Sequence, residues 1–193
     1  LFAALIAVLG LVPKIDLASG VPITAQSLGI MLCGTVLGAK RGALAVLLFL
    51  GLTLAGLPLL SGGRGGLGLL ASPTVGYLIG FPVAAYVTGA VTTHLKANIG
   101  LAAGLGAALG GVLVLNGLGV IGMSVMLGKT LPEAALLAAP FLIGDSIKAG
   151  LAGLLALPVR EFPQVDPPVV SVSTVYKGAS NEVIESRITE VIE

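Results

Sequence analysis

Residues 97–128 read ANIGLAAGLGAALGGVLVLNGLGVIGMSVMLG and contain no Asp, Glu, Lys or Arg. A membrane-spanning helix needs roughly 20 consecutive apolar residues, so this run is long enough to cross a bilayer. Small residues recur within it at four-residue spacing, in the pairs Gly100/Gly104 and Gly106/Gly110. Such pairs form flat helix faces that let another helix approach closely. We therefore predict a membrane helix that packs inside a bundle.

The rest of the chain has the same character. It is 56% hydrophobic and 10% charged, with a mean hydropathy of +1.09, whereas a soluble domain carries about 25% charged residues. So few charges cannot cover a soluble surface, and the lipid bilayer is the expected solvent. The predicted fold is all-α. It is an integral membrane bundle with a glycine-rich loop between its third and fourth helices, and its six helices lie near 1–12, 25–39, 42–57, 74–92, 98–122 and 134–157.

The balance of charge predicts two parts. Residues 1–157 carry seven Lys/Arg and three Asp/Glu, a net charge of +4, whereas residues 158–193 carry three and six, a net charge of −3, which together give the overall +1. The first part is the predicted membrane domain, and its helix at 1–12 is interpreted as the end of a longer helix. In the tail we predict a proline-rich linker, a strand at 169–176 and an amphipathic helix near 181–193.

The basic residues in the turns predict an orientation. Lys and Arg are enriched on the cytoplasmic side of membrane proteins. Four Lys/Arg residues fall in the turns and the chain end on one side of the bundle, and three fall in the loops on the other side. This slight excess predicts that both ends of the bundle lie in the cytoplasm and that the loop around Arg64 lies outside.

The glycine-rich loop matches a nucleotide-binding pattern only superficially. Gly63, Gly65 and Gly68 have the spacing of the dinucleotide fingerprint, but that fingerprint requires a preceding strand and an acidic residue about 20 positions further on. Here the preceding segment is a predicted helix, and the next acidic residue is Glu133. We therefore reject nucleotide binding by this loop.

The inventory of reactive residues argues against catalysis. The only cysteine, Cys33, and the only histidine, His94, cannot build a four-ligand zinc site. His94 lies in a predicted turn away from Ser61 and Ser72, so a Ser-His-Asp triad is not expected. The sequence has no Walker motif, so any ATP-driven step has to come from a partner. We predict no enzymatic activity, no cofactor, no metal and no nucleic-acid partner.

Two charged residues stand within the last predicted span. Asp145 and Lys148 are three residues apart, so they share one helix face. Charges within a membrane span are costly and usually mark a pathway or a ligand site. The alternative is that they only neutralise each other inside the bundle. Asn116, a polar residue of the fifth span, is interpreted first as an interhelical hydrogen bond and second as a ligand contact.

These residues suggest a binding pocket. Irregular backbone at membrane depth is tolerated where it lines a cavity. We therefore expect a re-entrant glycine-rich loop to bring backbone N–H groups and Arg64 over an apolar pocket, with Asp145 and Lys148 on its floor. The implied ligand is small and partly apolar, and it carries an anionic group together with hydrogen-bonding groups.

Residues 1–157 resemble the BioY family, the biotin-capturing S subunits of energy-coupling factor (ECF) transporters. Three stretches carry the resemblance: 20–68, GVPITAQSLGIMLCGTVLGAKRGALAVLLFLGLTLAGLPLLSGGRGGLG; 72–82, SPTVGYLIGFP; and 144–148, GDSIK. The family usually reads Gly-Pro-Thr-Gly-Gly-Tyr where this chain has SPTVGY, so Ser72 and Val75 replace glycines. If either position required a positive φ, the loop would be strained here.

The resemblance implies high-affinity capture of biotin in the cytoplasmic membrane, in assembly with a transmembrane coupling subunit and two ATPase subunits. In S subunits the first helix carries an Ala-x-x-x-Ala face for the coupling subunit, which Ala3 and Ala7 match; their alternative role is internal packing. The residues expected to bind the substrate are Arg64, Thr74, Tyr77, Asn116, Asp145 and Lys148. Tyr77 has a second interpretation, as an anchor at the membrane interface.

Two other classes of function stay open at this point. One is a self-sufficient facilitator for biotin or small carboxylates, which would work without an ATPase. The other is a membrane fragment of an efflux pump, because residues 158–193 resemble the segment after the first membrane helix of resistance-nodulation-division pumps. The pumps are far larger than this chain, and the pump interpretation leaves the glycine-rich loop unexplained.

Overall fold

The computed structural model describes residues 1–17 and 19–160, of which every regular element is a helix. The strand predicted at 169–176 and the helix predicted near 181–193 lie outside the described residues. In chain order the elements are α1 (Phe2–Leu9), α2 (Gln26–Leu37), α3 (Ala39–Leu54), the short 3₁₀ helix η1 (Leu67–Ala71), α4 (Val75–His94), α5 (Ile99–Ala107), the π-helical η2 (Ala108–Val114), α6 (Leu115–Leu127) and α7 (Leu131–Arg160).

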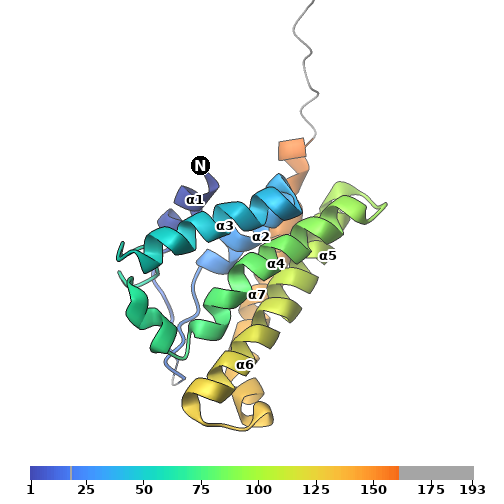
Figure 1. Ribbon diagram of the computed structural model, residues 1–193. Coiled ribbons are helices and arrows are strands. Elements are labelled where there is room, and N and C mark those ends of the chain that lie inside the picture. Colours follow the sequence, from blue (N-terminus) through green and yellow to red (C-terminus); the bar gives the residue numbers. More distant parts are fainter. Residues whose placement is uncertain (18, 161–193) are drawn as a thin grey trace, which may run out of the picture. The chain divides into compact units, whose positions relative to one another are not determined.

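The prediction of six helices in an all-α bundle is confirmed. Figure 1 shows α5, η2 and α6 running on as one span, so the principal helices are α1, α2, α3, α4, this composite span and α7. Three helical stretches among the described residues are long and apolar enough to cross a membrane, namely Val75–His94, Ile99–Leu127 and Leu131–Ala156. Large apolar side chains such as Leu113, Val125, Ile143 and Leu154 are exposed along their outward faces, as expected of surfaces that face lipid.

The second and third helices meet more abruptly than predicted. Only Gly38 separates α2 from α3, and its φ of 79° is a conformation that glycine adopts without steric cost. Lys40 and Arg41 therefore lie in the first turn of α3, and not in a loop as the predicted start at 42 implied. At the other end of the chain, α1 ends at Leu9, three residues before its predicted limit.

The fifth span is longer than predicted and contains an irregularity. It continues to Leu127 and ends at Gly128, whose φ of 62° and ψ of 30° are typical of a glycine that terminates a helix. The π-helical residues of η2 interrupt it near the middle. Such segments accommodate an extra residue within a helix and are frequent at functional sites. Asn116 is the second residue after η2, and its side-chain amide donates to the carbonyl of Val112, within η2, at 2.9 Å.

The last helix starts before its predicted limit, where Glu133 caps its first turn. The backbone N–H and the hydroxyl of Thr130 both donate to Glu133 Oε2, at 2.9 and 2.8 Å. The Glu133 carboxylate thus satisfies the backbone donor of the residue before the helix, as the acidic member of a capping box does. Pro132 is tolerated there because the first turn needs no donor from it. The helix consequently begins at Leu131, and not at 134.

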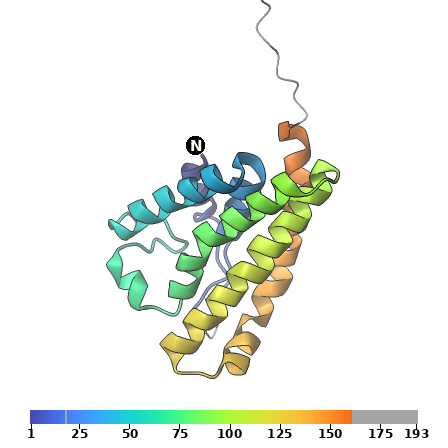
Figure 2. The ribbon, with the colours of Figure 1, turned by 45° about the vertical axis from the view of Figure 1, so that its right-hand side comes forward.

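Glycines allow the helices to approach closely around α4, which packs against α2, α3, α5 and α6. Figure 2 shows α4 beside the composite span and α7 behind it. A Cβ on Gly153 of α7 would lie 2.8 Å from the carbonyl oxygen of Gly100 and 3.1 Å from the Cα of Gly104. The Gly100/Gly104 pair therefore serves packing within the bundle, as predicted from its spacing.

A pair of substitutions tests this close packing. A Cβ on Gly89 of α4 would lie 2.3 Å from the backbone nitrogen of Ala39, so Gly89→Ala should destabilise the fold by about 1–3 kcal/mol. Gly51 of α3 has open space around it, and Gly51→Ala should leave stability unchanged or raise it by up to about 1 kcal/mol. Thermal unfolding of the two variants in detergent measures the difference. Equal melting temperatures would show that the α3–α4 contact is not tight.

Candidate ligand-binding site

A pocket lies between the start of α2, the glycine-rich loop and helices α4, α6 and α7. The empty space between its lining side chains, together with the open solvent at its mouth, amounts to about 510 Å³. Its wall is partly polar and partly apolar. The lining residues are Val21, Pro22, Thr24, Gln26, Ser27, Leu60, Arg64, Thr74, Tyr77, Leu78, Phe81, Leu115, Phe141, Asp145 and Lys148.

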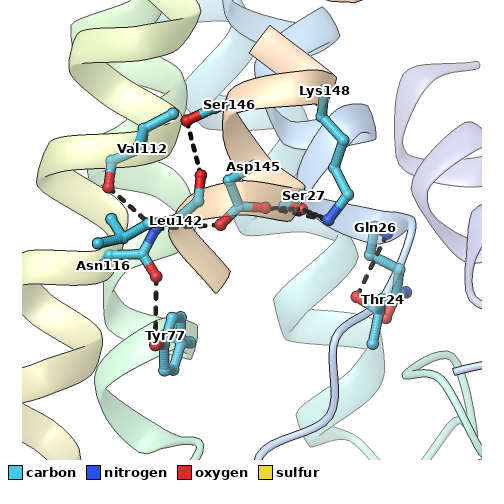
Figure 3. A network of polar contacts seen from close by, with 10 residues as sticks. All are labelled: Thr24, Gln26, Ser27, Tyr77, Val112, Asn116, Leu142, Asp145, Ser146 and Lys148. Carbon is cyan, nitrogen blue, oxygen red and sulfur yellow. Dashed lines mark hydrogen bonds and ion pairs between the residues drawn. The ribbon is translucent and has the colours of Figure 1, made fainter. Parts of the chain in front are cut away.

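Asp145 and Lys148 form an ion pair in this wall. Lys148 Nζ lies 3.0 Å from Asp145 Oδ1, and Asp145 is only 3% exposed. Ser27 of α2 bridges the pair, because its hydroxyl donates to Asp145 Oδ1 at 2.8 Å and accepts from Lys148 Nζ at 2.9 Å. Figure 3 shows the three side chains converging from α2 and α7. The two side chains thus lie on one helix face, as their spacing predicted, and both line the pocket.

Asn116 holds the other oxygen of the same carboxylate. Its amide nitrogen donates to Asp145 Oδ2 at 3.0 Å, and its amide oxygen accepts from the hydroxyl of Tyr77 at 3.3 Å. The chain of contacts from Tyr77 through Asn116 to Asp145 joins α4, α6 and α7 (Figure 3). Asn116 is not among the residues that line the pocket. The structure thus favours the first interpretation of this residue, an interhelical hydrogen bond.

The glycines of the loop make a tight turn that carries Arg64. Leu60 and Arg64 form an isolated antiparallel bridge, with N–O distances of 3.0 and 3.2 Å. Between them Gly62 and Gly63 have φ values of 80° and 70°, which favour glycine over residues with a Cβ. Arg64 Nε donates back to the carbonyl of Ser61 at 3.3 Å. The turn therefore fixes both the backbone and the side chain of Arg64, which is half-buried in the pocket wall.

Several backbone N–H groups of the loop bond within the protein and do not point at the pocket as we expected. We expected them to point at the ligand, but several are already bonded within the protein. The N–H of Ser61 donates to Gln26 Oε1 at 3.0 Å, that of Arg64 to Leu60 at 3.2 Å and that of Gly66 to Thr53 at 2.8 Å. Because each of these three donors already has a partner within the protein, they hold the loop together and are not free for a ligand.

The two positions where the family usually has glycine are unstrained. Ser72 has φ −116° and ψ 158°, Val75 begins α4, and none of the described non-glycine residues has a positive φ. The hydroxyl of Ser72 donates to the carbonyl of Leu69 at 2.7 Å and also contacts the hydroxyl of Thr74. Ser72 thus touches a pocket-lining residue through a group that glycine lacks.

The remaining wall is apolar and partly aromatic. The rings of Tyr77 and Phe141 are 5.3 Å apart between centroids and inclined by 40°, an arrangement within the favourable range for aromatic pairs. Phe81 and Leu115 extend the same wall. Tyr77 is buried, so it is not an anchor at the membrane interface.

Sequence reasoning missed ten of the fifteen residues that line this pocket, among them Gln26, Ser27, Phe81 and Phe141. Gln26 and Ser27 are uncharged and lie in a run that was interpreted only as a membrane span. Two adjacent polar residues near the start of an otherwise apolar run were the signal that could have indicated a polar site there. The aromatic residues gave no signal, because phenylalanine is equally typical of lipid-facing and core positions.

Ala3 and Ala7 are half-buried and pack against the hydrophobic core. Ala4 and Val8, on the adjacent face of α1, are exposed. Contact with a coupling subunit stays a prediction for Ala3 and Ala7.

Of the six predicted substrate-binding residues, the structure places five in one pocket wall and Asn116 in contact with two of them. The pocket offers one carboxylate, which accepts hydrogen bonds, and two cationic side chains, which only donate them. This combination suits a small ligand that has an anionic group, neutral polar groups and an apolar body.

Comparison with known proteins agrees with this architecture. Residues 1–164 match the sequence model of the BioY family. The chain is similar to a "Biotin transporter BioY" of Rhodobacter capsulatus, with 49% identity over 84% of this chain and 90% of the relative. It is also similar to a "Biotin transporter BioY" of Rhizobium etli, with 47% identity over 80% of this chain and 87% of the relative.

A solved structure shares the fold. It is described as the S-component for biotin from an ECF-type ABC transporter and superposes with a TM-score of 0.75 at 32% identity, covering 82% of this chain and 86% of that one. The family match extends over the whole bundle, so the bundle is not a fragment of an efflux pump. On its sequence and its fold alike, this chain belongs to the BioY family.

Proposed function

We propose that this chain captures biotin in the cytoplasmic membrane, as the S component of an ECF-type uptake transporter. The observation that carries the proposal is the pair of the buried Asp145 and the part-buried Lys148, which shares one pocket with Arg64 and an aromatic wall. Relatives named as biotin transporters and a solved S-component for biotin support it. We assign the chain no catalytic reaction, because its family consists of transporters.

The ureido ring of biotin fits the charged pair chemically. It offers two N–H donors and one carbonyl acceptor. Ionised Asp145 can only accept hydrogen bonds, so it suits the ureido N–H groups, and Lys148 can only donate them, so it suits the ureido carbonyl. Ser27 and Asn116 already hold the carboxylate from two sides, so the acceptor is oriented before the ligand arrives.

Arg64 suits the other polar end of biotin. A guanidinium pairs well with a carboxylate, and we place the valerate carboxylate against it. The apolar chain and the sulfur-containing ring then lie along Tyr77 and its aromatic neighbours, and the hydroxyl of Thr74 adds a polar contact.

The proposed partners are a transmembrane coupling subunit and two ATPase subunits, which supply the energy that this chain does not. We propose that α1 contacts the coupling subunit through Ala3 and Ala7. Small side chains at this spacing allow a second helix to approach closely.

Calorimetric titration tests the ligand class. The purified protein in detergent should bind biotin with a dissociation constant below about 1 μM, equivalent to more than about 8 kcal/mol of binding free energy. Thiamine and riboflavin should not bind, because neither presents a ureido group to the Asp145–Lys148 pair together with a carboxylate for Arg64. Weaker binding of biotin by a folded sample, or equal binding of the three vitamins, would refute the proposal.

Two substitutions test the roles of the charges. Removing one member of a desolvated charged contact costs about 2–5 kcal/mol, so Asp145→Asn should weaken biotin binding well over tenfold. Arg64→Ala should weaken it less, and should affect biotin far more than biotin methyl ester, which lacks the carboxylate charge. The measurement is titration of both variants with both ligands. An equal loss for acid and ester in Arg64→Ala would contradict the carboxylate assignment, and wild-type affinity in Asp145→Asn would contradict the ureido assignment.

Substitutions on α1 test the partner face. Ala3→Trp should prevent assembly with the coupling subunit, because the bulky ring separates the two helices, while biotin binding is retained. Ala4→Trp on the exposed adjacent face is the matched control and should leave assembly intact. Co-purification of the coupling subunit measures assembly, and biotin titration confirms folding. If only the Ala4 variant fails to assemble, the partner face is the exposed side of α1.

A further inference from the structure

The side chain of Gln26 is buried in the pocket wall, with 1% of the residue exposed, and makes three hydrogen bonds. Its amide nitrogen donates to the carbonyl of Ile6 in α1 at 3.1 Å and to that of Leu59, just before the glycine-rich turn, at 3.0 Å. Its amide oxygen accepts from the N–H of Ser61 at 3.0 Å. One neutral side chain therefore joins α1, α2 and the loop.

Ser61 connects this amide to Arg64. Its N–H is held by Gln26, and its own carbonyl accepts from Arg64 Nε at 3.3 Å. The bridge between Leu60 and Arg64 closes the same turn. The two peptide groups around Ser61 thus lie between the Gln26 amide and the Arg64 guanidinium. Loss of the Gln26 amide would therefore weaken the contact that holds the Arg64 side chain.

A second anchor of the loop lies on α3, where the N–H of Gly66 donates to the carbonyl of Thr53. That bond holds the chain after Arg64, whereas Gln26 holds the chain before it. Without Gln26, the glycines at 62 and 63 would allow the turn many conformations, because glycine populates both signs of φ. The side chain of Arg64 would then lose a defined direction.

We propose that Gln26 is a positioning residue for Arg64, and that through Arg64 it determines the preference of the pocket for a ligand with a free carboxylate. This inference rests on the proposed function, because it takes Arg64 as the partner of the biotin carboxylate. Gln26 itself need not touch the ligand, since its three hydrogen bonds already use both of its donors and one of the two lone pairs of its amide oxygen.

The neighbouring residue supplies a matched control. Ser27 is also buried and lies next to Gln26 on α2 (Figure 3), but its hydroxyl contacts Asp145 and Lys148. Ser27 therefore supports the ureido end of the pocket, and Gln26 supports the carboxylate end. Substitutions at the two positions should differ in the ligand that they affect.

A double-mutant cycle is the first test, by titration of wild type, Gln26→Leu, Arg64→Ala and the double variant with biotin and biotin methyl ester. Gln26→Leu should weaken biotin binding about tenfold, the usual effect of losing a hydrogen bond to a charged group, and should leave ester binding unchanged. In the Arg64→Ala background it should have no further effect, because residues that act through one another are not additive. Ser27→Ala should weaken acid and ester alike and should add to Arg64→Ala.

The second test needs no ligand. Trypsin cleaves after arginine when the backbone opens locally, so Gln26→Leu should speed cleavage of the Arg64–Gly65 bond at least about threefold, whereas Ser27→Ala should not. The fragments are identified by mass. Gln26→Met, which keeps the side-chain length, replaces the leucine variant if the latter does not fold.

Equal losses for acid and ester in Gln26→Leu, full additivity with Arg64→Ala, or unchanged cleavage would each overturn the role of Gln26. Failure of the wild-type protein to bind biotin would instead refute the proposed function, while the cleavage assay would still decide whether Gln26 holds the turn.

Discussion

A carboxylate buried among membrane helices has to be compensated, and the arrangement of this bundle meets that requirement at Asp145. Three donors reach its two oxygens: Ser27 from α2, Asn116 from α6 and Lys148 from one turn further along α7. An unpaired charge in such a place would cost several kcal/mol, so α2, α6 and α7 must meet in one register for the fold to be stable. The same requirement leaves an oriented acceptor and a cationic donor at the pocket surface. Stability of the bundle and recognition of a polar ligand thus depend on the same four side chains.

The glycines complement this polar centre. Close backbone approach between α4 and its neighbours, and between α5 and α7, occurs where glycine removes the Cβ. Helix association in lipid gains little from the hydrophobic effect, so it relies on such tight packing. The positive-φ glycines of the loop serve a different purpose, because they let Arg64 return beside Leu60 within a short turn. Glycine therefore serves both the close packing of the helices and the tight turn that places Arg64 in the pocket wall.

Composition and runs without charge were enough to predict six helices, because a bilayer restricts the chain to few solutions. The limits of the helices were harder to predict. The pattern of Thr130 and Glu133, three residues apart, is a sequence signal for the start of α7, whereas the π segment leaves no signature in a run of small apolar residues. Asp145, Lys148 and Arg64 stood out because charges are rare in this chain. Gln26 and Ser27 did not, since their importance arises from contacts with residues more than 30 and 100 positions away in the sequence, which no local pattern reveals.

The π segment has a consequence for the direction in which the long fifth span presents its polar residue. Each residue of an α-helix turns the chain by about 100°, so the additional residue accommodated by η2 offsets the faces of α5 and α6 by about that angle. In an uninterrupted helix the side chain of Asn116 would point about 120° away from the direction of Gly104, and the offset reduces this angle to about 20°. Gly104 approaches Gly153 of α7, and Asn116 bonds to Asp145 of the same helix. The irregularity therefore keeps a packing glycine in one half of the span and the polar amide in the other half turned toward the same neighbouring helix.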